Sequence, residues 1–149
     1  MKNNTTAIVR ININAPVAKI WEALTNPEII KQYFFGTQTI TDWKPGSPII
    51  FEGEWQGKKY RDKGRILEVE DQKLIKYNYW SSMSGIEDKP ENYVILTYML
   101  TGSDNNVTLS IKQENIPGEK MKEHSQENWK KVLEGLKQVV EEKMVPVAV

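Results

Sequence analysis

Two stretches of this 149-residue chain decide its fold: APVAKIWEAL at residues 15–24 and EKMKEHSQENWKKVLEGLKQVVEEK at residues 119–143. In the first stretch, Pro16 favours the start of a helix. Ile20, Ala23 and Leu24 then recur at spacings of three and four residues, which gives the helix one apolar face. A short helix is therefore predicted directly after a short opening strand.

The second stretch is typical of a long amphipathic helix, because polar residues fill the positions between its apolar ones. The apolar stripe consists of Met121, Ser125, Trp129, Val132, Leu133, Leu136, Val139 and Val140. At about 1.5 Å per residue, a helix from Glu119 to about Lys143 would be nearly 40 Å long. A helix of this length can cross a whole small domain.

The segment between these helices has the pattern of strands separated by turns. Strands are predicted at about 6–13, 37–41, 49–55, 60–69, 73–80, 92–101 and 106–115. Pro27 favours a second short helix through Lys31. We expect an α+β fold in which a curved seven-stranded antiparallel sheet wraps around the C-terminal helix, with two short helices after the first strand. Such a sheet cannot contact one helix equally everywhere, so a cavity can open between them.

Composition narrows the classes of function. Twenty basic and twenty acidic side chains cancel, which disfavours nucleic acid and anionic membranes as partners. The chain has no cysteine, so disulfides and thiol nucleophiles are excluded. No apolar run approaches the roughly 18 residues that span a bilayer, and the N-terminus has no apolar signal core. We expect one cytoplasmic domain over residues 1–149, with residues 144–149 as a flexible tail.

Five segments in the same order resemble a known family. They are APVAKIWEALTNP (15–27), DWKPGSP (42–48), GRILEV (64–69), PENY (90–93) and NWKKVL (128–133). Together they are similar to single-domain bacterial members of the START-like helix-grip superfamily (SRPBCC), in the branch named after the C-terminal domain of the activator of the ninety-kilodalton heat-shock-protein ATPase. The resemblance implies a helix-grip fold with a deep cavity, which in related branches holds sterols, lipids, polyketides or other hydrophobic molecules.

Strand periodicity predicts which side chains face such a cavity, because alternate residues of a strand share one face. We expect a wall formed by Phe51, Trp55, Tyr60, Tyr77, Tyr79, Trp129 and Leu133, with Asp62 and Gln113 orienting a ligand. An aromatic wall with few polar groups suits an apolar small molecule. The alternative is that the same side chains fill a close-packed core and leave no usable cavity.

Asp62 is the candidate for acid or base chemistry, because the pattern of its strand directs it inward. A buried carboxylate is costly, so it would raise its pKa or pair with Tyr60, Tyr77 or an arginine. It could act as a general acid or base, close a structural hydrogen-bond network, or sit at a solvated rim. Farther along this strand, Leu67 and Val69 predict that Gly64 or a nearby bulge shifts the inward phase.

Tyr33, Phe34 and Phe35 precede the flexible Gly36, at the position where the resemblance implies a cavity entrance. These aromatic side chains either gate the cavity or pack under the long helix. His124, the only histidine, falls off the Trp129 stripe, so we expect it at the surface and predict no catalytic triad. No spacing of ligands indicates a metal, and no glycine-rich loop indicates a phosphate. We therefore expect no metal and no cofactor.

The leading hypothesis is a cytoplasmic protein that binds a hydrophobic or aromatic small molecule between the sheet and the C-terminal helix. One alternative, implied by the resemblance, is a cyclase-like or dehydratase-like enzyme that uses Asp62 as acid or base. Another is an interaction module for a chaperone ATPase, which would make the chaperone a protein partner. The sequence is compatible with a monomer or a homodimer.

Overall fold

The computed structural model describes residues 3–144, without the side chains of Trp55 and of residues 142–144. Its elements in chain order are β1 (Thr5–Ile13), α1 (Val17–Thr25), α2 (Pro27–Tyr33), β2 (Gln38–Ile40), β3 (Pro48–Trp55), β4 (Lys58–Glu70), β5 (Leu74–Trp80), η1 (Pro90–Asn92), β6 (Val94–Ser103), β7 (Asn106–Ile116) and α3 (Glu119–Met144). Of the tail expected at residues 144–149, all but Met144 lies outside the described residues.

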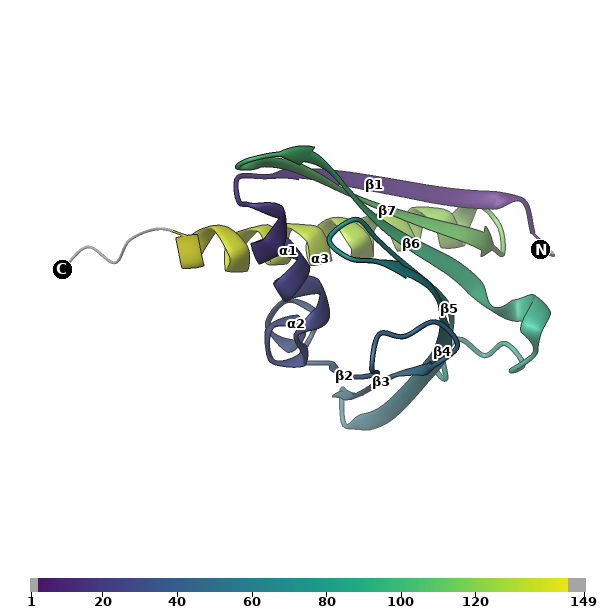
Figure 1. Ribbon diagram of the computed structural model, residues 1–149. Coiled ribbons are helices and arrows are strands. Elements are labelled where there is room, and N and C mark those ends of the chain that lie inside the picture. The colour runs from purple at the N-terminus through teal and green to yellow at the C-terminus, as the bar shows by residue number, and fades with distance from the viewer. Residues whose placement is uncertain (1–2, 145–149) are drawn as a thin grey trace.

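The seven strands form one antiparallel sheet in the order β1-β7-β6-β5-β4-β3-β2. Figure 1 shows this sheet curling around α3, with β1 and β2 at its two edges. The predicted α+β helix-grip fold, with two short helices after the first strand, is confirmed. Strands β2 to β7 are sequential neighbours, as hairpin connections require.

The long helix does not contact the sheet evenly. It packs on β1 and β7, whereas α2 packs on both α3 and β2. In Figure 1 the strands from β5 to β2 curve away from the β1 edge, and α1 and α2 lie across the opening. The concave side is therefore closed by α3 at one edge of the sheet and by α2 at the other.

The apolar stripe of α3 faces the core over its C-terminal half. Val132, Leu133, Leu136 and Val140 are buried, but Met121 is 42% exposed, so its predicted place in the stripe is wrong. A spacing of four residues advances about 400° around a helix of 3.6 residues per turn. Stepping by fours from Leu133 back to Met121 therefore rotates the side chain by about 120°, out of the interface.

Polar contacts fix the far end of α3 against the start of the fold. The Lys137 Nζ donates to the Asn12 carbonyl oxygen at 2.7 Å, and the Asn14 N–H donates to the Glu141 Oε2 at 2.9 Å. Lys137 and Glu141 also pair with each other at 2.7 Å. The helix is thereby held in one register against the end of β1.

The short helices begin as the sequence predicts. Ile20, Ala23 and Leu24 are the buried residues of α1. Pro16 is the N-cap of α1, one position before its predicted place in the first turn. The Asn26 side chain accepts the Glu28 N–H and caps α2, where proline occupies the first turn.

The predicted phase shift in the fourth strand is a β-bulge. The register between β4 and β5 shifts between Ile66 and Glu68, which places the bulge at Leu67 and not at Gly64. Ile66 is fully buried and Val69 packs on the core, while Leu67 is 41% exposed. The extra residue lets both Ile66 and Val69 face inward despite their odd spacing.

Among the described residues, no helix combines the length and the apolar character that crossing a membrane requires.

Gly64 is required by the close approach of β4 and β5. A Cβ at this position would overlap the Asn78 carbonyl oxygen, so the backbone of β5 would have to move. We expect Gly64→Ala to lower the free energy of unfolding by about 2 kcal/mol or more, measured by urea denaturation. The exposed Glu54→Ala on β3 is the control and should change it by less than about 1 kcal/mol. An unchanged stability of Gly64→Ala would contradict this strand packing.

Candidate functional site

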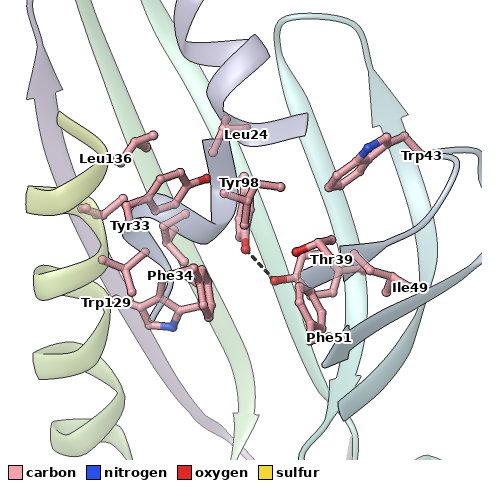
Figure 2. Close-up of a pocket in the computed structure, with 15 residues that line it drawn as sticks. Leu24, Tyr33, Phe34, Thr39, Trp43, Ile49, Phe51, Tyr98, Trp129 and Leu136 are labelled. Carbon is pink, nitrogen blue, oxygen red and sulfur yellow. Dashed lines mark hydrogen bonds between the residues drawn. The ribbon is translucent and has the colours of Figure 1, made fainter. Parts of the chain in front are cut away.

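A small cavity of about 20 Å³ lies between the sheet, α2 and α3. Figure 2 shows the 15 side chains that line it, which come from both faces of the gap between helices and strands. A cavity of this size holds about one water molecule. Drug-sized ligands occupy pockets of about 300–1,000 Å³, so a ligand of that size needs the walls to move.

Five aromatic side chains form a closed circuit around the cavity. Their ring centroids are 6.2 Å apart for Phe34 and Phe51, 5.8 Å for Phe51 and Tyr77, 5.5 Å for Tyr77 and Tyr98, 5.9 Å for Tyr98 and Trp129, and 5.9 Å for Trp129 and Phe34. We call this set the aromatic circuit. Stacked and edge-to-face pairs at these separations are favourable.

Unlike the other four members of the aromatic circuit, Phe34 does not lie within a helix or a strand. Phe51, Tyr77 and Tyr98 lie in β3, β5 and β6, and Trp129 lies in α3. Phe34 is the C-cap of α2, and the next two residues, Phe35 and Gly36, have φ of 56° and 73°. A left-handed phenylalanine is unusual and costs conformational energy. The segment that carries Phe34 is therefore an irregular turn.

Three hydroxyl groups give the cavity a polar side. The Tyr77 and Tyr98 hydroxyls hydrogen-bond to each other at 2.5 Å. Thr39 also lines the cavity, and its Oγ1 is buried without a hydrogen-bond partner among the described residues. Burial raises the pKa of Tyr77 and of Tyr98, so both hydroxyls stay protonated at neutral pH.

Tyr33 and Trp43 use their polar ends to hold the helices at the cavity. The Tyr33 hydroxyl donates to the Ala23 carbonyl oxygen at 2.8 Å, and burial raises its pKa. The Trp43 Nε1 donates to the Thr25 carbonyl oxygen at 3.0 Å. Their rings are left to line the cavity.

The structure brings part of the predicted site together. Of the predicted wall and entrance, the cavity lining contains Tyr33, Phe34, Phe51, Tyr77, Trp129 and Leu133. Tyr60, Asp62, Tyr79 and Gln113 are not in that lining, and the Trp55 side chain lies outside the described residues. Phe35 points away from the core and is 56% exposed.

Gln113 acts on the cavity through Trp129. Its Oε1 accepts the Trp129 Nε1–H at 2.8 Å, which fixes the orientation of the indole ring. Tyr60 instead bonds outside the cavity, with its hydroxyl 2.5 Å from the Thr37 Oγ1. Both residues position the walls, and neither supplies a free polar group to the cavity.

Asp62 is buried in a complete hydrogen-bond network. Its Oδ2 accepts the Tyr79 hydroxyl at 2.6 Å, and its Oδ1 accepts the Ser82 N–H at 2.8 Å and the Ser82 Oγ–H at 3.0 Å. The expected hydrogen-bond network is present, but its members are not the neighbours that the sequence suggested, Tyr60, Tyr77 or an arginine. Burial first, and Asp62 next, raise the pKa of Tyr79, so it remains a donor. The carboxylate ties the segment after β5 to β4.

Sequence reasoning omitted Thr39, Trp43 and Tyr98 from the site. For Tyr98 the available signal was its alternation with Leu96 and Leu100, and all three are buried. Thr37 and Thr39 are buried with exposed Gln38 between them, so alternation in this three-residue strand was the available signal. Trp43 has φ of 61° in a turn, where periodicity carries no information.

His124 is exposed, as predicted, and lies 3.5 Å from the Asn128 side chain on the same helix. Among the described residues, no group of three or more histidine, cysteine, aspartate or glutamate side chains could hold a metal ion.

The model of the protein family described as Activator of Hsp90 ATPase homolog 1-like protein matches residues 14–141 of the chain. A comparison with the curated proteins finds no match. The family match spans the helices and strands that enclose the cavity, from the end of β1 to the last turns of α3.

Solved structures show the same fold. A protein from Cytophaga hutchinsonii is 46% identical, with 97% of this chain and 99% of that chain covered and a TM-score of 0.82. A Mesorhizobium loti protein is 20% identical over 93% of this chain and 98% of that chain, with a TM-score of 0.76. The Aha1 dimer from Colwellia psychrerythraea is 18% identical over 92% and 96%, with a TM-score of 0.72. The last two show likeness of fold alone.

The Asp62 network predicts a stability effect. Asp62→Ala leaves the hydroxyl of Tyr79 and the donors of Ser82 without their acceptor, so we expect a loss of about 2 kcal/mol in the free energy of unfolding. Urea denaturation measures it. The control is Asp88→Ala, which removes an exposed carboxylate that pairs with Lys63 at 2.5 Å and should have a smaller effect. Equal losses in the two variants would contradict a structural role for Asp62.

Proposed function

The chain belongs to the family of Activator of Hsp90 ATPase homolog 1-like proteins, and from this premise we propose that it binds a hydrophobic or aromatic small molecule between the sheet and α3. The observation that carries the proposal is the aromatic circuit around a cavity with a buried hydroxyl side. A concave, mostly apolar lining with a few convergent polar groups is what small-molecule sites require.

The size of the cavity means that binding displaces a wall. Its volume of about 20 Å³ admits no organic ligand as it stands. An apolar cavity of about 150 Å³ accepts benzene, and the ring of Phe34 is itself of benzene size. Outward movement of this one ring would therefore make room for an aromatic group between Phe51 and Trp129, the two members of the circuit that it now contacts.

Phe34 is the wall residue best suited to move. Trp129 is held by Gln113, and Tyr77 and Tyr98 are held by each other. Phe34 has ring contacts alone and sits at the end of α2, before the strained turn at Phe35. We therefore assign Phe34 as the gate of the site. The neighbouring Tyr33 stays in place, because its hydroxyl is hydrogen-bonded to α1.

The cyclase-like or dehydratase-like alternative has weaker support. It requires an acid or base that reaches the bound molecule. Asp62 is outside the cavity lining, and its two oxygens already accept three hydrogen bonds. A role for Asp62 in holding the segment after β5 accounts for its burial.

A chaperone-interacting role is the second candidate, and the family description is the observation that favours it. It would use an outer surface and not the cavity. Binding to a chaperone and stimulation of its ATPase, with no small molecule bound at any stage, would favour this candidate over the first.

Native mass spectrometry of the protein purified gently from its own host tests the proposal. We expect a discrete additional mass that is lost on denaturation and that belongs to a small apolar molecule. A bare protein mass, together with no binding of aromatic probes by the purified protein, would overturn the proposal.

If the Phe34 ring blocks the site, shortening this side chain should raise the affinity of the protein for an aromatic ligand. In Phe34→Ala the bound state no longer requires displacement of the ring, so 2-naphthol should bind at least about tenfold more tightly than to the unaltered protein, measured by calorimetry. Phe34→Leu keeps more of the packing and should give a smaller gain, which guards against poor folding of the alanine variant.

The matched control for the gate is Phe35→Ala. Phe35 is the adjacent aromatic residue, but it is exposed and does not line the cavity. Its ring contacts that of Phe34 edge-on at 6.0 Å, so its removal should raise the affinity for 2-naphthol far less than removal of Phe34 does. Equal affinities in the Phe34 variants and the unaltered protein would show that Phe34 does not block the site.

A further inference from the structure

The buried hydroxyls of the cavity have donor capacity that the protein does not use. Among the side chains that the structure describes, Thr39 Oγ1 is the buried polar atom that lacks any hydrogen-bond partner. In the Tyr77–Tyr98 pair, one hydroxyl donates to the other at 2.5 Å, and the hydrogen of the accepting hydroxyl is left over. Buried polar groups are nearly always satisfied, so these two spare donors need an explanation.

The spare donors lie at the same side of the cavity. Thr39 pairs with Phe51 across β2 and β3, and the ring of Phe51 contacts that of Tyr77 at 5.8 Å. Figure 2 shows Thr39, Phe51 and Tyr98 around the same space, with the hydroxyl bond of Tyr98 directed to that side. A molecule between Phe51 and Trp129 would therefore meet hydroxyls at one end and aromatic faces along its length.

The lining carries no charge that could balance an ionised ligand. In the described part of the chain, none of the lining side chains is a lysine, arginine, histidine, aspartate or glutamate. The tyrosine hydroxyls are neutral at pH 7, because the ordinary pKa of tyrosine, about 10, already lies well above it and burial raises it further. A carboxylate or ammonium group in this space would be buried without a counter-ion, which is strongly unfavourable.

We propose that the ligand is a neutral, largely aromatic molecule with a single acceptor oxygen, such as a ketone or an ether, which accepts hydrogen bonds from Thr39 and the Tyr77–Tyr98 pair. This inference rests on the proposed function and narrows its substrate class. Fatty acids and other anionic lipids are excluded as ligands. A pure hydrocarbon binds less well, because it leaves the spare donors unsatisfied.

The test compares four molecules of similar shape: naphthalene, 2-methoxynaphthalene, 2-acetonaphthone and 2-naphthoate. Binding is measured by calorimetry and ligand-observed NMR on the full chain and on Phe34→Leu. We expect the two neutral oxygen compounds to bind about tenfold more tightly than naphthalene, which corresponds to one or two net hydrogen bonds. We expect 2-naphthoate to bind more weakly than naphthalene.

Thr39→Val, Tyr77→Phe and Tyr98→Phe connect this preference to the hydroxyls, because loss of one tyrosine hydroxyl alone would leave the other free to donate. Thr39→Val keeps the shape of the side chain and removes an unsatisfied buried group, so the protein should stay folded and be at least as stable. In the triple variant, which removes all three hydroxyls, the preference for 2-methoxynaphthalene over naphthalene should fall to within about twofold. Asp62→Asn, which changes a polar group outside the cavity, should retain the preference.

The outcomes separate the two proposals. If none of the four compounds binds either protein, the proposed function fails and this inference fails with it. If naphthalene binds as tightly as the oxygen compounds, if 2-naphthoate binds most tightly, or if the preference survives in the triple variant, the ligand class is wrong while the binding function stands.

Discussion

The structure depends on the burial of one face of α3 against one edge of a strongly curved sheet. Val132, Leu133, Leu136 and Val140 form that face, and the helix packs on β1 and β7. Because the sheet curls away from this contact, its other half needs a second cover, which α2 supplies. The cavity lies where these two covers meet, so its position follows from the curvature of the sheet.

The polar groups of the interior divide into two systems with different roles. Both oxygens of the Asp62 carboxylate accept hydrogen bonds, from Tyr79 and Ser82, and the carboxylate stabilises the segment after β5. The hydroxyl side of the cavity, around Thr39 and Tyr98, is neutral and incompletely satisfied. A network in which every member has a partner favours rigidity, whereas unused donors in an apolar space favour recognition of a partner group.

Periodicity predicted the strands and most of the inward faces, because burial on one side of a sheet imposes alternation. It failed where the chain departs from regular geometry. The bulge was expected, but its position at Leu67 depends on pairing with β5. Met121 was misplaced because a four-residue spacing drifts around a helix. Asp62 was correctly directed inward and buried, yet its partner Ser82 lies in a segment after β5 whose conformation no pattern predicted.

The sequence by itself determined the fold class, the order of the elements and the aromatic character of the interior, since these follow from local periodicity and turn residues. Only the tertiary structure decided which side chains meet. Phe34 contacts Phe51 and Trp129, which lie far from it in the chain. The Thr39 hydroxyl is buried without a partner because of the side chains that surround it in the folded protein. Such contacts depend on how far the sheet curls and where α2 docks, and packing of the whole domain sets both.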